Sequence, residues 1–132
     1  MTVEHAAPVA GFLVRPEDPN HGNYPGSFIW TGKFVGHEGK VDQIIEAIKE
    51  NLPHIEQSEQ ETISFLILRG ITHPDTVYIW ERYTSEEAFK NIHQQSDGYK
   101  KMRQKNEANA KSREMNGYYE VMGFLTKQGG II

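Results

Sequence analysis

The chain has 132 residues, no cysteine and a formal net charge of −4. This length suits one domain with its own core, and the lack of cysteine excludes disulfides, thiolate zinc sites and cysteine nucleophiles. The lysines are dispersed among acidic residues, so no basic surface for nucleic acid is expected. No apolar run approaches the roughly 20 residues of a membrane span, and Glu4 and His5 interrupt the start where a signal peptide would be basic and then apolar. We therefore expect a cytoplasmic protein that binds neither nucleic acid nor membrane.

The first 26 residues are rich in proline, glycine, asparagine and histidine. This composition predicts an extended arm over residues 1–26, in which only 9–14 suits a short strand. The main domain is expected at 27–126, followed by a short tail at 127–132.

The first half of the domain begins with a predicted strand at 27–35 and a helix from residue 40 to 52. Apolar residues recur at helical spacing along this helix. Pro53 is expected to end or kink this helix. The polar residues 54–61 are expected to connect it to the next strand.

Two strands, 62–70 and 77–83, are predicted to form a hairpin around the proline turn at 73–75. The strand at 62–70 is apolar on both faces, which is typical of a strand buried on both faces. Its two apolar sets are Ile63, Phe65 and Ile67 on one side and Leu66 and Leu68 on the other.

A helix is predicted at 85–95, with Thr84 as its N-cap and Glu87 closing a capping box. At α-helical spacing one face points toward the interior with the histidine at its edge. The residues on this face are Ala88, Phe89, Ile92 and Ser96, and His93 lies at its edge.

Residues 96–98 are expected to break the chain before a third, polar helix at 99–115, which Gly117 ends before a last strand at 118–125. The order β-α-β-β-α-β predicts an α+β, ferredoxin-like fold with a four-stranded antiparallel sheet. Its helices would cover one sheet face only. Because the strand at 62–70 is apolar on both faces, we expect a homodimer in which two sheets stack.

Glu81 alternates with Val77 and Ile79 along its strand and is therefore expected to point inward. A buried carboxylate needs a partner. Two interpretations remain open: Glu81 orients His93, or it has a structural bond to an arginine or to a partner subunit.

The order of elements, Trp-Glu-Arg-Tyr at 80–83 and Ala-Phe-Lys-Asn-Ile-His-Gln-Gln-Ser-Asp-Gly-Tyr at 88–99 resemble the antibiotic biosynthesis monooxygenase family of dimeric α+β barrel proteins. The resemblance covers about 28–125. The family shows a Glu-Arg-Trp/Tyr strand end, then a helical histidine, a serine-containing break and an aromatic residue. Glu81, His93, Ser96 and Tyr99 occupy those places here. The triad of the haem-degrading branch is not matched.

The resemblance implies an enzyme that oxygenates an aromatic substrate with molecular oxygen and without cofactor or metal. His93 is the first candidate for its base, because an ordinary histidine titrates near neutral pH, and Glu81 would tune it. The alternative is a histidine that only forms a structural hydrogen bond. Six residues are candidates for substrate binding: Trp30, Phe65, Trp80, Phe89, Ile92 and Tyr99.

These features predict a monooxygenase-like protein of secondary metabolism that acts on a small phenolic, quinol or polyketide-type aromatic substrate. Two alternatives stay open. The same scaffold serves non-oxidative cyclases, isomerases and lyases, and it also suits a dimer that binds a small molecule without catalysis.

Overall fold

The computed structural model describes residues 27–123. The expected arm at 1–26, the tail at 127–132 and the end of the predicted last strand lie outside this range. No helix in the described part is long and apolar enough to cross a membrane. The elements in chain order are β1 (Phe28–Gly36), α1 (Val41–Lys49), α2 (Leu52–Ser58), β2 (Thr62–Arg69), β3 (Thr76–Tyr83), α3 (Glu86–Ala88), the π-helical turn η1 (Phe89–His93), α4 (Asp97–Asn109) and β4 (Ala110–Tyr119).

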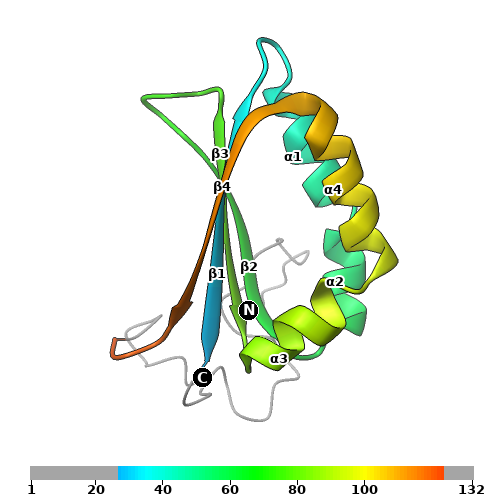
Figure 1. Cartoon of the computed structure of the whole chain (residues 1–132), viewed down its shortest axis with the longest axis vertical. Helices are drawn as coiled ribbons and strands as arrows, with labels where there is room; N and C mark the ends of the chain where they lie inside the picture. Colours follow the sequence, from blue (N-terminus) through cyan, green and yellow to red (C-terminus); the bar gives the residue numbers. More distant parts are fainter. Residues whose placement is uncertain (1–26, 124–132) are drawn as a thin grey trace, which may run out of the picture.

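The four strands form one antiparallel sheet in the order β2-β3-β1-β4. The predicted ferredoxin-like fold is thereby confirmed. The helices lie together on one side of this sheet (Figure 1). At its centre Trp30 of β1 pairs with Glu81 of β3 on one side and with Gly117 of β4 on the other. Residues in register share a sheet face, so these three positions all face the helices.

The opposite face of the sheet carries the alternate residues of each strand. Three of its large side chains are substantially exposed, namely Leu68 (48%), Tyr78 (41%) and Tyr118 (51%). They come from β2, β3 and β4. None of the described helices covers this face (Figure 1).

The prediction for 40–61 was wrong in two respects, because α1 ends at Lys49 and the polar segment after Pro53 is mostly helical. It forms α2, with Pro53 in the first turn. A proline is tolerated there because the first helical N–H groups have no intrahelical acceptor. The consequence is that Glu59, directly after α2, is carried into the interior and is 2% exposed.

The predicted capping box was also wrong, by one residue. The side chain of Ser85 accepts a hydrogen bond from the Ala88 amide at 3.1 Å and is the N-cap. Thr84 instead directly follows β3 and is bonded to Glu61, the residue before β2. Its amide donates to the Glu61 carbonyl at 3.0 Å and its hydroxyl to Glu61 Oε1 at 2.6 Å.

The helix then widens into the π-helical turn η1, in which the Gln94 amide bonds to the Phe89 carbonyl at 2.9 Å. The wider turn changes which side chains face inward. Phe89 and His93 are 1% and 2% exposed, whereas Ile92 is 42% exposed. The predicted face was therefore right for Ala88 and Phe89 and wrong for Ile92, and His93 lies inside the core rather than at its edge.

The third helix is shorter than predicted, and the last strand starts earlier. Ser96 caps α4, with its hydroxyl accepting from the Tyr99 amide at 3.2 Å, so the expected break at 96–98 contains the first helical turn. Residues 110–119 are a strand because they pair with β1 along its length. Gly117 lies within β4, where a side chain would meet the ring of Phe28 at 2.9 Å.

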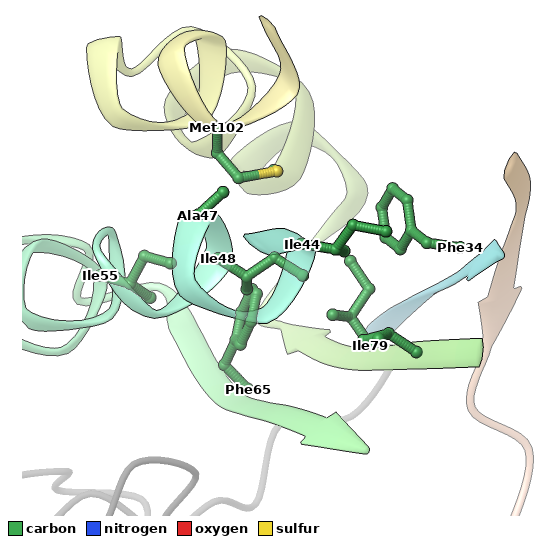
Figure 2. Close-up of a cluster of buried hydrophobic side chains, with 9 residues drawn as sticks. Phe34, Ile44, Ala47, Ile48, Ile55, Phe65, Ile79 and Met102 are labelled. Carbon is green, nitrogen blue, oxygen red and sulfur yellow. The ribbon is translucent and has the colours of Figure 1, made fainter. Parts of the chain in front are cut away.

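The main core lies between the helices and the inner sheet face. Figure 2 shows Met102 of α4 directed toward Ala47 of α1, and Ile48 directed toward Phe65 of β2. A smaller aromatic cluster extends this core at one end of the sheet. It consists of Phe28, Tyr83 and Phe89, with Trp30 packed against them.

Gly98 provides a test of how α4 packs on the α1–α2 junction. A Cβ at Gly98 would lie 1.9 Å from Oδ1 of the buried Asn51. Helix propensity alone would make Gly98→Ala stabilising by roughly 0.5–1 kcal/mol. We expect the steric overlap between the new methyl group and Asn51 to outweigh this gain. It should lower the unfolding free energy by about 1–3 kcal/mol, measured by urea denaturation. The double variant Asn51→Ala/Gly98→Ala should be less destabilised than Asn51→Ala alone. A stabilising Gly98→Ala would contradict the packing described here.

Candidate active site

His93 lies between two buried carboxylates. Its Nδ1 is 2.8 Å from Glu59 Oε1, and its Nε2 is 3.6 Å from Glu81 Oε1. All three side chains are 2–3% exposed. The π-helical turn supplies the histidine, the segment after α2 supplies Glu59, and β3 supplies Glu81. The group therefore joins three elements that are distant in sequence.

Glu81 is further held by Tyr83, two residues later on the same inner face of β3. The fully buried Tyr83 hydroxyl donates a hydrogen bond to Glu81 Oε1. The contacts to Tyr83 and His93 thus fall on the same carboxylate oxygen.

Glu59 connects the same group to the surface. Its Oε1 accepts a hydrogen bond from the Thr62 hydroxyl at 3.2 Å, and its Oε2 is 3.4 Å from Nε2 of His54, whose side chain is 49% exposed. Sequence reasoning missed Glu59 because it lies in a polar segment without periodicity. No local pattern in the sequence marks it, because the burial of His93 that calls for a second carboxylate is visible only in the structure.

The pKa values within the group are shifted in opposite directions. Burial by itself would lower the pKa of His93, but the hydrogen bond to Glu59 and the charges of Glu81 and Glu59 raise it above its usual value. Burial by itself would raise the pKa of Glu59, yet the hydrogen bond and charge of His93, helped by Thr62 and His54, lower it. Both shifts favour an imidazolium–carboxylate pair between His93 and Glu59.

Glu81 behaves differently from Glu59. Desolvation raises its pKa above the ordinary value, and the charge of His93 and the hydrogen bond from Tyr83 offset this only in part. Burial and the neighbouring Glu81 also raise the pKa of the Tyr83 hydroxyl, which stays protonated. Glu81 is thus the carboxyl of this group that is most readily protonated.

A small cavity of about 20 Å³ lies between the inner sheet face and α4, next to Glu81. That volume is enough for about one water molecule. His93 does not border it. The cavity is lined by Trp30, Phe34, Ile79, Glu81, Tyr99, Met102, Arg103, Arg113 and Met115.

The structure brings three of the predicted site residues, Glu81, Trp30 and Tyr99, to this cavity. His93 lies behind Glu81, and its ring is surrounded by aromatic rings at centroid distances of 5.2–6.2 Å. These are the rings of Phe65, Tyr83, Phe89 and Tyr99.

Two predicted binding residues lie apart from the cavity. Trp80 is in register with Thr31 and Leu66 and points to the opposite face of the sheet. Ile92 lies on the exposed side of η1. Phe65 and Phe89 are buried core residues that contact the site through the His93 ring. Among residues 27–123 no cluster of three or more histidine, aspartate or glutamate side chains is arranged to hold a metal ion.

The ion pair predicts a pH-dependent cost of removing His93. We expect His93→Gln to lower the unfolding free energy by on the order of 3–5 kcal/mol at pH 6, because Glu59 loses its charged partner while buried. The raised pKa of His93 means that its contribution is complete below the unfolded value of 6.5 and is lost as pH rises through the folded value.

The measurement is urea denaturation of wild type and His93→Gln at pH 6 and pH 9. The difference between their unfolding free energies should be smaller at pH 9. Below the lowered pKa of Glu59 the contribution should vanish as well, since that carboxylate is then protonated. His37→Gln, an exposed histidine, is the control. A difference that is constant from pH 6 to 9 would show that His93 is buried in its neutral form.

Comparison with known proteins agrees with this fold. The model of the antibiotic biosynthesis monooxygenase family matches residues 28–105. Among curated proteins, none matches the sequence significantly. A solved protein of Shewanella oneidensis superposes with a TM-score of 0.69 at 20% identity, covering 74% of this chain and 94% of its own.

Two further solved structures are named as proposed antibiotic biosynthesis monooxygenases. The protein from Bacteroides thetaiotaomicron has a TM-score of 0.68 at 16% identity and covers 76% of this chain and 95% of its own. The protein from Caulobacter crescentus has a TM-score of 0.68 at 13% identity and covers 78% and 97%. At these identities the structures support the fold, and the family model supports the family. The chain therefore belongs to the antibiotic biosynthesis monooxygenase family and is monooxygenase-like in its general function.

Proposed function

We propose that this protein oxygenates a small phenolic, quinol or polyketide-type aromatic substrate with molecular oxygen and without a cofactor, and that Glu81 is its base. One observation carries the proposal: Glu81 is a buried carboxylate that borders the cavity beside α4. A base must reach the proton that it removes, and His93 lies outside the cavity lining.

The roles expected from the sequence are exchanged in this proposal. Only a neutral imidazole accepts a proton, and the two carboxylates raise the pKa of His93 and favour its charged form. A carboxyl whose pKa is raised by burial is a stronger base than an ordinary one once it is ionised. His93 and Tyr83 then act as positioning residues, because both hold Oε1 and leave Oε2 of Glu81 to accept the proton.

The reaction balances without an external reductant. Glu81 removes the phenolic proton, and the electron-rich phenolate forms a C–O bond from a ring carbon to O₂. Cleavage of the O–O bond leaves one oxygen on the ring as a carbonyl. The other oxygen leaves as water with the hydrogens of the former O–H and C–H groups. The substrate supplies all four electrons, so a phenol becomes a quinone.

A ring-sized substrate requires the cavity to open, since it now has room for about one water. The walls differ in their freedom to move. Glu81, Phe34 and Ile79 are buried, whereas Trp30 and Met115 are half-buried and Arg113 is exposed. Opening on the side of β4 and α4 would leave the base in place.

The small volume favours one alternative, a protein that binds a small molecule without oxidising it. A non-oxidative acid–base reaction at Glu81, as in a cyclase or isomerase, is the other. Both differ from the proposed function in a measurable way, because neither consumes oxygen.

We expect Glu81→Gln to reduce oxygen consumption by roughly 10²–10⁴-fold, the usual contribution of a general base. The measurement uses a panel of hydroquinones and anthrones, with ¹⁸O₂ to show transfer of one oxygen atom to the product. Glu87→Gln, which changes an exposed glutamate, is the matched control. Wild-type turnover should rise with pH through the raised pKa of Glu81, above the ordinary 4.5.

Equal rates for Glu81→Gln and wild type would remove Glu81 from the mechanism. A rise in rate only above pH 6.5, through the raised pKa of His93, would return the role of base to the histidine. Oxygen-independent exchange of substrate C–H for deuterium that requires Glu81 would favour the non-oxidative alternative. Binding without either reaction would favour the non-catalytic one.

The proposal includes a second copy of the chain stacked on the outer sheet face. Leu68, Tyr78 and Tyr118 expose between 41% and 51% of their surface across three strands of that face. Exposed apolar groups of this kind are typical of an interface. A two-fold axis would pack the face against itself with no other partner required.

Sedimentation velocity tests the homodimer. We expect the native chain to sediment as a dimer and Leu68→Asp to yield monomers or aggregates, because the carboxylate would be buried without a partner. Ile71→Asp is the control, since Ile71 is 97% exposed in the loop after β2. A native chain that sediments as a stable monomer would rule the homodimer out.

A further inference from the structure

We infer that the substrate is a hydroxyaryl carboxylic acid, whose carboxylate is held by Arg103 and Arg113 while its hydroxyl points to Glu81. The inference rests on the proposed function because it concerns the same cavity. It adds two residues and a charged group of the ligand that neither the family nor the fold assigns.

The two arginines come from opposite walls of the cavity. Arg103 lies in α4, and Arg113 lies in β4 on the sheet face that is directed toward the helices, in register with the buried Phe34. Arg113 is exposed and the Arg103 side chain is 49% exposed, whereas Glu81 is 2% exposed. The cavity is therefore lined by a buried glutamate and by two arginines whose side chains reach solvent.

Both arginines have hydrogen-bonding capacity to spare. Arg103 approaches only Glu107 among the described carboxylates, at 3.9 Å, and this exposed pair one helical turn apart contributes little. Arg113 forms no ion pair with the part of the chain that the structure describes. By contrast, Arg69 bonds to Asp42 at 3.1 Å, and the buried Arg82 is paired with Glu120.

The remaining walls indicate what lies between the charged ends. Trp30 and Tyr99 offer aromatic surfaces, and Met102 and Met115 offer thioethers that adapt to a flat ring. A guanidinium forms two parallel hydrogen bonds with a planar carboxylate. A ligand with a phenolic hydroxyl at one edge and a carboxylate at the opposite edge satisfies both ends of the cavity.

The arrangement also keeps the substrate's charge away from the base. A carboxylate placed beside Glu81 would raise the pKa of that carboxyl further and weaken it as a base at neutral pH. Placed between two guanidinium groups, the carboxylate is neutralised at the exposed end. The exposed side chains of the arginines are also the parts of the wall that can move to admit a ring.

The test uses 6-hydroxy-2-naphthoic acid, in which the two groups lie at opposite ends of a flat ring system, beside its methyl ester. Binding to the full chain is measured by titration calorimetry at low salt, with no turnover needed. We expect the acid to bind at least about tenfold more tightly than the ester. Arg103→Gln and Arg113→Gln should each remove most of this preference, while Lys111→Gln, an exposed cation of β4 outside the cavity lining, should keep it.

Equal affinity for acid and ester, or no binding of either, would overturn the inference. So would loss of the preference in Lys111→Gln, which would indicate a general effect of surface charge. Acid-selective binding that depends on both arginines, in a protein that consumes no oxygen with any phenol, would uphold the inference and refute the proposed oxygenation. Oxygen consumption with neutral phenols but no acid preference would do the reverse.

Discussion

The rest of the site depends on the contacts of the buried His93 ring with Glu59 and Glu81. Two carboxylates, Glu59 and Glu81, are buried within reach of one ring, and without a cation between them they would repel each other in a poorly solvated interior. The ring also joins the segment after α2, the π-helical turn and β3. Its burial therefore helps to fix how the helical layer sits on the sheet, together with the main core of α1, α2 and α4 against the inner sheet face (Figure 2).

The same interaction separates the two carboxyl groups chemically. Glu59 has the shorter contact to the ring together with Thr62 and His54, so it is held ionised. Glu81 has the longer contact and the greater desolvation, so its proton is retained to higher pH. Pairs of groups whose pKa values are pushed apart by their surroundings are typical of acid–base sites. Glu81 also borders the cavity, and for this reason we assign the proposed chemistry to this residue.

Local sequence patterns predicted the fold well where they were strong and failed where tertiary contacts decided the outcome. The apolar strands at 62–70 and 77–83 were found almost to the residue, because β-branched and aromatic runs have few alternatives. The polar residues 110–115 were predicted to be helical, yet they form a strand because they pair with the edge of β1. The capping position moved from Thr84 to Ser85 since the backbone of Thr84 is still bonded to Glu61. The π-helical turn left no sequence signal and reversed the exposure of Ile92 and His93.

The sequence by itself determined the β-α-β-β-α-β order, the ferredoxin-like class, the inward direction of Glu81 and the choice of His93 as a residue of interest. Alternation along a strand and motif spacing are local properties, and they suffice for such predictions. Only the tertiary structure decided that His93 lies behind the cavity with a raised pKa, that Glu59 is its partner, and that Arg103 and Arg113 line the same space as Glu81. Charge state and cavity lining depend on which distant segments meet in low dielectric, and no local pattern encodes those distances.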